Sequence, residues 1–414
     1  MVPMKVGMIG VGGFAGGTHV PNVAANPNFE LAALCDLNEQ RLKELAAKYK
    51  SGYTTTDMQR IFKDPAIEMI VCGTKPAFRL PIMRAAVEHR KHLFVEKPMC
   101  YTAEDLRVMV PLMRKAPIKF MVGFNRPYSP MMQALKPIYR RHLVPEGKMQ
   151  NAECRMQKEE GGNRTTKDPA LPEQMSALKP INQRQKEGGN TTIIYRIIGE
   201  AQMWPPQVFN AVVHQKESTI IHEVTHIFDL LNWITDLKPT RVYTAGGGNM
   251  DNVITLTYPD NVTAVVISGD NASTAFPKER IEIDTNHGTI VGESFVELQT
   301  AGIEGAAQRQ TFPYSQQGKT CDNGVAGYFD RLWAWRRKVT AEERAYGYYY
   351  ERMPLADKGH YNELDFFRKI IQADQPSQTD VIGGAAAELI ALAAIESWKT
   401  GQPKDLDFKY LERL

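Results

Sequence analysis

The sequence predicts two domains: a doubly wound parallel α/β domain over residues 1–123 and an α+β domain with an open, mainly antiparallel sheet over residues 124–414. Short apolar runs alternate with helix-compatible segments through the first 123 residues, which is typical of a parallel sheet. Residues 253–268 and 280–297 instead alternate apolar and polar side chains around turn sequences, which indicates antiparallel hairpins. A chain of 414 residues is also too long for one ordinary domain.

The stretch from Met4 to Asp36 has the arrangement of a dinucleotide-binding unit. The apolar run 6–9 leads into the turn 10–15, Gly-Val-Gly-Gly-Phe-Ala, and a second apolar run, 31–35, ends on Asp36. The first glycine allows a tight turn, the second lets the backbone approach a pyrophosphate, and the small third residue allows a helix to pack on the strand. An acid about twenty residues further on can bind the ribose hydroxyls. We therefore expect a Rossmann domain that binds NAD; NADP is disfavoured because Asp36 would repel a 2′-phosphate, although Arg41 moderates this preference.

The rest of the first domain continues the alternation. Helices are expected at 38–49, after Asp57, at 78–88 and behind a Thr102–Asp105 capping box, and strands at 67–72, 93–95 and 120–122. Ligands bind at the carboxyl ends of the strands in such sheets. The residues predicted to contact the cofactor are therefore the glycine turn and the loops at those ends: Gly10, Gly12, Gly13, Phe14, Ala15, Asp36, Arg41, Thr74, Pro76, Glu96, Lys97 and Asn125.

A polar stretch, 157–192, interrupts the second domain and is rich in Gly, Lys, Asn and Gln. Two interpretations stay open, a disordered insertion and a lid or oligomer arm. The chain returns to helix at 360–371 and at 383–398, an Ala-rich segment expected to pack on the sheet or on the first domain.

The bulk composition is that of a globular protein, with 43% hydrophobic and 23% charged residues. A net charge of +3 with no basic stripe gives no reason to expect nucleic acid. No apolar run looks long enough to cross a bilayer, and the first strand begins too early for a signal peptide. The five cysteines are scattered, which suits reduced thiols. These features predict a cytoplasmic protein.

Glu96-Lys97-Pro98 directly follows a predicted strand. A lysine next to a proline on such a loop is held in place, and here it lies at the same sheet edge as the glycine turn. This position suits proton transfer or hydrogen bonding at a substrate hydroxyl. A surface lysine in a turn is the plainer alternative.

His222-Glu223-Val224-Thr225-His226 would place both histidines on one face of a helix. The spelling also matches the zinc-binding helix of a peptidase, but no third ligand follows at a recognisable spacing, and a dinucleotide domain has no place in such an enzyme. The remaining interpretations are two structural histidines or a shared catalytic face, and we favour the catalytic face. No metal is expected.

Together these motifs resemble the glucose–fructose oxidoreductase / inositol dehydrogenase / MocA (Gfo/Idh/MocA) family. The likeness rests on the turn 10–15, Glu96-Lys97-Pro98, the stretch 123–126, the helix with His226 and Asp229, and the segment 358–360. It implies a substrate cleft between a Rossmann domain and an open-sheet domain, and hydride exchange at a sugar or polyol carbon. It also implies that Lys97 and His226 handle the hydroxyl proton, and that the sheet face joins a homodimer or homotetramer.

Two positions depart from the family pattern. Many members carry an aspartate where this chain has His222, and Thr-Pro-Pro-x-x-His where it has Thr-Lys-Pro-Ala-Phe-Arg at 74–79. A histidine can be neutral or cationic near pH 7, so His222, with Arg126, is hypothesised to favour an anionic or unusual sugar; either could equally be a scaffold residue. Tyr128 completes the predicted substrate contacts, beside Lys97, Arg126, His222 and His226.

The sequence thus predicts an NAD-dependent oxidoreductase acting on a secondary hydroxyl of a sugar, glycoside or cyclic polyol, with Lys97, His226 and His222 as catalytic residues. One alternative is a redox-neutral NAD-dependent glycoside hydrolase, which oxidises the sugar transiently, eliminates the aglycone and returns the hydride. Another is a non-enzymatic dinucleotide sensor, against which the pairing of Lys97 with His226 argues.

Overall fold

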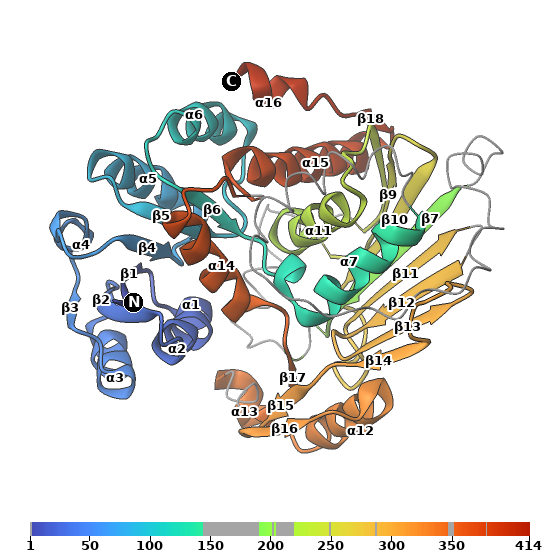
Figure 1. Cartoon of the computed structure of the whole chain (residues 1–414), viewed down its shortest axis with the longest axis horizontal. Helices are drawn as coiled ribbons and strands as arrows, with labels where there is room; N and C mark the ends of the chain where they lie inside the picture. The colour runs from blue at the N-terminus through green and yellow to red at the C-terminus, as the bar shows by residue number, and fades with distance from the viewer. Residues whose placement is uncertain are drawn as a thin grey trace, which may run out of the picture.

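Two sheets form the framework of the molecule (Figure 1). The computed structural model describes residues 2–143, 190–200, 203, 219–247, 250–285, 288–346, 352–377 and 379–414. The predicted polar stretch 157–192 lies outside these residues, except that Thr191 and Thr192 begin a strand.

The first sheet has six parallel strands in the order β3-β2-β1-β4-β5-β6, which confirms the predicted doubly wound domain. Its strands are β1 (Met4–Ile9), β2 (Phe29–Cys35), β3 (Tyr53–Thr55), β4 (Met69–Cys72), β5 (His92–Glu96) and β6 (Phe120–Gly123). Its helices are α1 (Gly13–Gly17), α2 (His19–Ala25), α3 (Glu39–Tyr49), α4 (Met58–Lys63), α5 (Arg79–Glu88) and α6 (Ala103–Arg114).

Side-chain caps begin three of these helices, and the caps at Asp57 and Thr102 are the predicted ones. Asn38 accepts a hydrogen bond from the Arg41 amide at α3, and Asp57 accepts one from the Gln59 amide at α4. Thr102 accepts one from the Asp105 amide at α6. Each cap satisfies a donor that the first helical turn leaves free.

The second sheet has nine strands and is antiparallel except where β7 runs beside β10. Its strands are β7 (Thr191–Ile198), β8 (Arg241–Gly246), β9 (Asn252–Thr257), β10 (Val262–Gly269), β11 (Glu279–Thr285), β12 (Gly288–Glu293), β13 (Glu297–Ala301), β14 (Arg309–Thr311) and β18 (Lys404–Asp405). The predicted hairpins are β9–β10 and β11–β12. Alternate residues of β11, beginning with Glu279, Ile281 and Ile283, face the interior.

Helices cover one face of this sheet, while the other carries exposed apolar side chains. The helices include α7 (Pro130–Leu143), α11 (Thr225–Thr235) and α15 (Val381–Thr400), and α11 is preceded by a π-helical turn, Ile220–Val224 (Figure 1). On the outer face, Ile194, Tyr243 and Val253 are 36%, 41% and 44% exposed.

Helix α15 is long and apolar enough to span a membrane by length and composition, with a mean hydropathy of 1.5. This corrects the expectation that no apolar run reaches that length. However, 56% of its apolar window is buried inside the protein, where the helix packs on β8, α11 and α6. The helix thus contacts both domains, which is the position of a core helix that lies between them.

Helix α14 (His360–Gln372), although late in the chain, packs on α2 of the first domain. Its Leu364 and Phe367 join the apolar core beside β1 and β2. The peripheral elements are α12 (Gly324–Arg336), α13 (Ala341–Tyr346), α16 (Lys409–Arg413) and a small sheet of β15 (Tyr314–Gln316), β16 (Lys319–Cys321) and β17 (Leu355–Ala356).

Candidate functional site

The glycine turn has the shape that a dinucleotide requires. Gly10 has a φ of 78°, and a Cβ there would lie 2.7 Å from Thr74 Cγ2 and 2.8 Å from the Thr74 nitrogen, so a side chain would be strained and would clash. At Gly12 and Gly13 a Cβ would meet no atom within 4 Å, which leaves the backbone open to a ligand. Phe14 beside them is 51% exposed. These residues fit a bound pyrophosphate.

Asp36 and Arg41 stand where the predicted ribose contacts belong. Asp36 follows β2, and its Oδ1 accepts a hydrogen bond from the Asn38 amide at 2.9 Å. The Arg41 guanidinium lies beside the glycine turn, with Nη2 2.8 Å from the position a Cβ would take at Gly16. The structure therefore places a carboxylate and a guanidinium near the glycine turn.

The loop after β4 is fixed by Arg79. This arginine is 2% exposed and donates to the Thr74 carbonyl from Nε at 3.1 Å and from Nη2 at 2.7 Å. Its Nη1 donates to the Pro98 carbonyl. The predicted loop residues Thr74 and Pro76 are thereby tied to the loop that carries Lys97.

Glu96 begins that second loop and is buried. His19 Nε2 lies 2.5 Å from Glu96 Oε1. Glu363 of α14 completes the cluster, with no hydrogen-bond partner for its carboxyl among the described residues. Burial, reinforced by Glu96, raises the pKa of Glu363 well above its usual range, which favours the protonated carboxyl. The contacts of Glu96 are thus made to buried side chains of the protein, and they support the loop that carries Lys97.

Glu388 of α15 holds the far side of the loop through a 2.5 Å hydrogen bond from the Met99 amide to Oε1. Burial raises the pKa of Glu388 to about 8, against hydrogen bonds and Arg79, which lower it. A carboxyl whose pKa rises on folding stabilises the protein below its unfolded pKa, and that stabilisation is lost as the pH rises through the folded pKa.

We expect Glu388→Gln to remove part of the pH dependence of stability. Between pH 5 and 8 the wild type should lose up to about 1.4 kcal/mol per pH unit through this group, whereas a glutamine does not titrate. Unfolding midpoints measured at each pH should therefore favour the variant increasingly as the pH rises. Glu396→Gln, on the exposed side of the same helix, is the matched control. Parallel profiles for wild type and Glu388→Gln would contradict the prediction.

Lys97 links the two domains. Its Nζ donates to the His222 carbonyl at 2.7 Å and lies 3.5 Å from Glu223 Oε1. The His222 ring lies edge-on to Tyr101, with ring centroids 5.1 Å apart. The predicted helix is π-helical at Ile220–Val224, and the contact of His222 with Lys97 is made by its backbone carbonyl.

Glu223 is a charged residue of the site that the sequence suggested only as a peptidase base. Burial alone would raise its pKa, but Lys97, Lys278 and Arg126 lower it to about 2. Glu223 is therefore ionised at neutral pH and serves as a counter-ion for Lys97.

His226 and Asp229 lie one turn apart on α11, and both are buried. Burial, and then the charges of Arg126 and Lys97, hold the pKa of His226 well below its usual range. The His226 ring is therefore neutral at neutral pH, and burial raises the pKa of Asp229 well above its usual range. His226 Nδ1 has no hydrogen-bond partner among the described residues, and its ring meets Phe124 edge-on at 5.8 Å. A neutral imidazole in this position has a ring nitrogen that can accept a hydrogen bond from a hydroxyl group.

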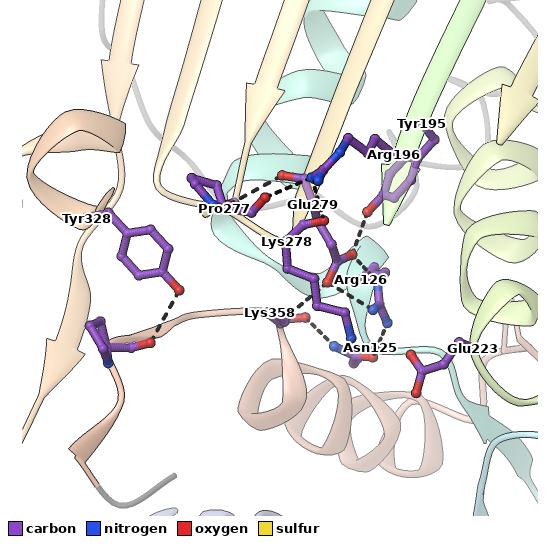
Figure 2. Close-up of polar contacts among 12 residues, drawn as sticks. Asn125, Arg126, Tyr195, Arg196, Glu223, Pro277, Lys278, Glu279, Tyr328 and Lys358 are labelled. Atoms are coloured by element: carbon purple, nitrogen blue, oxygen red, sulfur yellow. Dashed lines mark hydrogen bonds and ion pairs between the residues drawn. The ribbon is translucent and has the colours of Figure 1, made fainter. Parts of the chain in front are cut away.

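Arg126, for which the sequence leaves open a substrate contact or a scaffold role, is buried in an ion pair. It is 4% exposed and donates to Glu279 of β11 from Nε at 2.8 Å and Nη2 at 3.1 Å. Tyr195 and Lys358 donate to the same carboxylate, each at 2.7 Å (Figure 2). Burial alone would raise the pKa of Glu279, but Arg126 and Lys358 hold it well below its usual range.

Two further predicted contacts also turn inward. Asn125 is 1% exposed; its Nδ2 donates to the Lys358 carbonyl at 2.7 Å, and its Oδ1 accepts from Arg126 at 3.4 Å. Tyr128, predicted to bind substrate, is 7% exposed and packs on Phe366 with ring centroids 5.0 Å apart. Both residues position the chain after β6 and leave little surface for a ligand.

Residues 4–124 match the model of an oxidoreductase family with an NAD-binding Rossmann fold, Gfo/Idh/MocA. The first domain of the chain is therefore a Gfo/Idh/MocA Rossmann domain. The match confirms the resemblance for the glycine turn and for Glu96-Lys97-Pro98, whereas the helix with His226 and the segment 358–360 lie outside the matched residues.

Curated relatives within Gfo/Idh/MocA align mainly over this domain. An uncharacterized oxidoreductase, YrbE of Bacillus subtilis, is 30% identical over 132 residues, which are 32% of this chain and 38% of the relative. Myo-inositol 2-dehydrogenase of Thermotoga maritima is 27% identical over 133 residues, 32% of this chain and 40% of the relative. The chain thus spans about two fifths of the length of these two relatives. An inositol 2-dehydrogenase of Rhizobium meliloti aligns further, at 22% identity over 301 residues, 70% of this chain and 76% of that relative.

Structural similarity to Gfo/Idh/MocA proteins extends over both domains. A levoglucosan dehydrogenase in complex with NADH and L-sorbose has a TM-score of 0.67 at 20% identity and covers 98% of this chain and 100% of its own. Scyllo-inositol dehydrogenase of Lactobacillus casei with bound NAD(H) and scyllo-inositol has a TM-score of 0.64 at 15% identity, covering 97% and 99%. At these identities the likeness establishes the fold, including the mixed second sheet, and not the roles of individual residues.

Proposed function

We propose that the protein is an NAD-dependent oxidoreductase that transfers a hydride at a secondary hydroxyl of a sugar, glycoside or cyclic polyol. The observation that carries the proposal is the position of Lys97 at the carboxyl end of β5, 2.7 Å from the carbonyl of His222 in the other domain. An amine is held at the sheet edge that bears the glycine turn. The relatives named as inositol and levoglucosan dehydrogenases support the substrate class.

The residues around Lys97 suit the removal of a hydroxyl proton. Bound at the glycine turn, the dinucleotide would accept the hydride from the substrate carbon as the alcohol becomes a ketone. His226, neutral because of its burial, takes the hydroxyl proton. Lys97 donates a hydrogen bond to the substrate oxygen, while Glu223 and the His222 carbonyl hold its ammonium in place. His222 therefore acts through its backbone.

Three further points belong to this proposal. Asp36 favours NAD over NADP, although Arg41 beside Gly16 offers a charge that a 2′-phosphate could use. The exposed apolar side chains of the outer sheet face support a homodimer or homotetramer formed through that face. The protein acts in the cytoplasm on a small-molecule carbohydrate.

The test is one incubation followed in two ways. The protein is mixed with NAD or NADP and a panel of sugars, sugar acids, cyclic polyols and aryl glycosides, and reduced cofactor and products are measured by absorbance and mass spectrometry. NADH formed in step with a keto product is the expected result. Free aglycone without net NADH would make the protein a redox-neutral glycoside hydrolase instead. If no compound reacts although NADH binds, the sensor interpretation replaces the proposal.

A further inference from the structure

Positive charge exceeds negative charge where the two domains meet around Lys97. Within the described part of the chain, four cationic side chains and two carboxylates act on one another there: Lys97, Arg126, Lys278, Lys358, Glu223 and Glu279. Both carboxylates have pKa values below their usual range, so neither can relieve the surplus by gaining or losing charge near neutral pH.

Three of the four cations have partners inside the protein. Arg126 and Lys358 both donate to Glu279, the arginine through two nitrogens and the lysine at 2.7 Å. Lys97 is held by the His222 carbonyl and lies 3.5 Å from Glu223. These contacts use both carboxylates.

Lys278 is the fourth cation. It immediately precedes β11, and Figure 2 shows its side chain extending toward Asn125 and Glu223. Its Nζ forms no hydrogen bond or ion pair with any residue in the described ranges. Burial alone would lower the pKa of Lys278, yet Glu223 and Glu279 raise it above its usual value, so the side chain is an ammonium at neutral pH.

The other titratable groups nearby add little negative charge to that of Glu223 and Glu279. Burial first, and then neighbouring cations, hold the pKa values of His226 and His360 well below the usual range, so both rings are neutral. Burial raises the pKa of Asp270 to about 7, so this carboxyl is only partly ionised at neutral pH. Glu223 and Glu279 stabilise the ammonium through space, but no described residue accepts a hydrogen bond from its Nζ, so its N–H donors remain available to an anionic group.

We propose that the substrate carries a carboxylate and that Lys278 binds it. The substrate class is then a sugar acid or a carboxylated polyol, not a neutral sugar. This inference rests on the proposed function for the reaction, and it assigns the charge recognition to Lys278 in place of His222 and Arg126. A carboxylate carries one negative charge, which suits binding to a single ammonium in a site with one or two surplus positive charges.

The experiment compares matched acid and neutral sugars in the full-length protein. Binding of D-glucuronate, D-galacturonate, D-glucose, D-galactose and D-glucose 6-phosphate to the NADH complex is measured by thermal shift and calorimetry, and KM is measured wherever turnover occurs. The acids should bind at least about 10-fold tighter than their neutral counterparts, and Lys278→Met should reduce this acid-to-neutral ratio about 10- to 100-fold, as expected for a lost hydrogen bond to a charged group.

Lys278→Arg keeps the charge and should retain most of the ratio, whereas Lys399→Met, on an exposed helix position, should leave it unchanged. The inference is overturned if the acid preference survives Lys278→Met, or if acids and neutral sugars bind with equal affinity. In either case, oxidation of neutral sugars would leave the proposed function standing. Tightest binding of the phosphate sugar overturns the carboxylate assignment. Acid binding through Lys278 without any turnover would support the inference and contradict the proposed function.

Discussion

Replacing Lys97 by methionine is expected to lower kcat/KM for the oxidised substrate by about 1,000-fold, within the range for removing a donor that stabilises developing negative charge on a substrate oxygen. Methionine keeps most of the side-chain volume and removes the amine. The His222 carbonyl then loses its donor at 2.7 Å, and Glu223 loses the cation 3.5 Å away. No charge is left on this loop to polarise the substrate oxygen.

The controls separate chemistry from folding. Lys97→Arg keeps a cation, but its planar, larger head does not reproduce the point donor, so we expect a loss of at least about 10-fold. Lys115→Met replaces an exposed lysine at the end of α6 and should leave kcat/KM unchanged. NADH titration and the unfolding midpoint show whether Lys97→Met still binds cofactor and folds. Activity of this folded variant within about fivefold of wild type would remove Lys97 from the mechanism, since a positioned group contributes more than that.

The first sheet could be predicted because its signals are local. The turn at Gly10 is readable from three small residues, since a Cβ there has no room beside Thr74. The caps Asn38, Asp57 and Thr102 each act on an amide two or three residues away. A pattern that acts over so few residues leaves a clear mark in the sequence.

The charge cluster around Glu279 could not be predicted in the same way. Its members come from the turn after β6, from β7, from β11 and from the segment before α14, and 153 residues separate Arg126 from Glu279. One signal was available: Glu279 shares the inward parity of Ile281 and Ile283, and a carboxylate on an apolar face requires a buried cation. Which cation meets it depends on the packing of the two domains.

The helix around His222 shows another limit. The spacing of His222 and His226 predicts one shared face, but it presupposes regular α-helical geometry. The π-helical turn at Ile220–Val224 changes that geometry, and Lys97 reaches a carbonyl. Side-chain identity carries no information about such a backbone contact.

Glu279→Gln is expected to be the most destabilising single substitution considered for this protein. Glu279 is 2% exposed and accepts hydrogen bonds from Arg126, Tyr195 and Lys358. A neutral amide leaves the guanidinium of Arg126 buried without its counter-ion, which typically costs about 3 to 5 kcal/mol. Urea unfolding of the full-length protein at neutral pH measures this loss.

The pH dependence supplies an independent check. Because the pKa of Glu279 is depressed on folding, its stabilisation is present above the unfolded pKa of a glutamate and is lost as the pH falls through the folded value. The difference between wild type and Glu279→Gln should therefore be full above about pH 5 and shrink in acid.

A matched substitution lies on the same strand. Glu282→Gln breaks a 2.8 Å ion pair with Arg280 whose carboxylate is 31% exposed, and a pair of that kind contributes about 0 to 1 kcal/mol. If the two variants lost equal stability, burial would not be what makes the Glu279 contacts strong. Arg126→Met combined with Glu279→Gln removes both buried charges and should recover part of the loss, since the cost lies in the unpaired guanidinium. A double variant less stable than Glu279→Gln alone would mean that Tyr195 and Lys358, not Arg126, carry the dependence on this carboxylate.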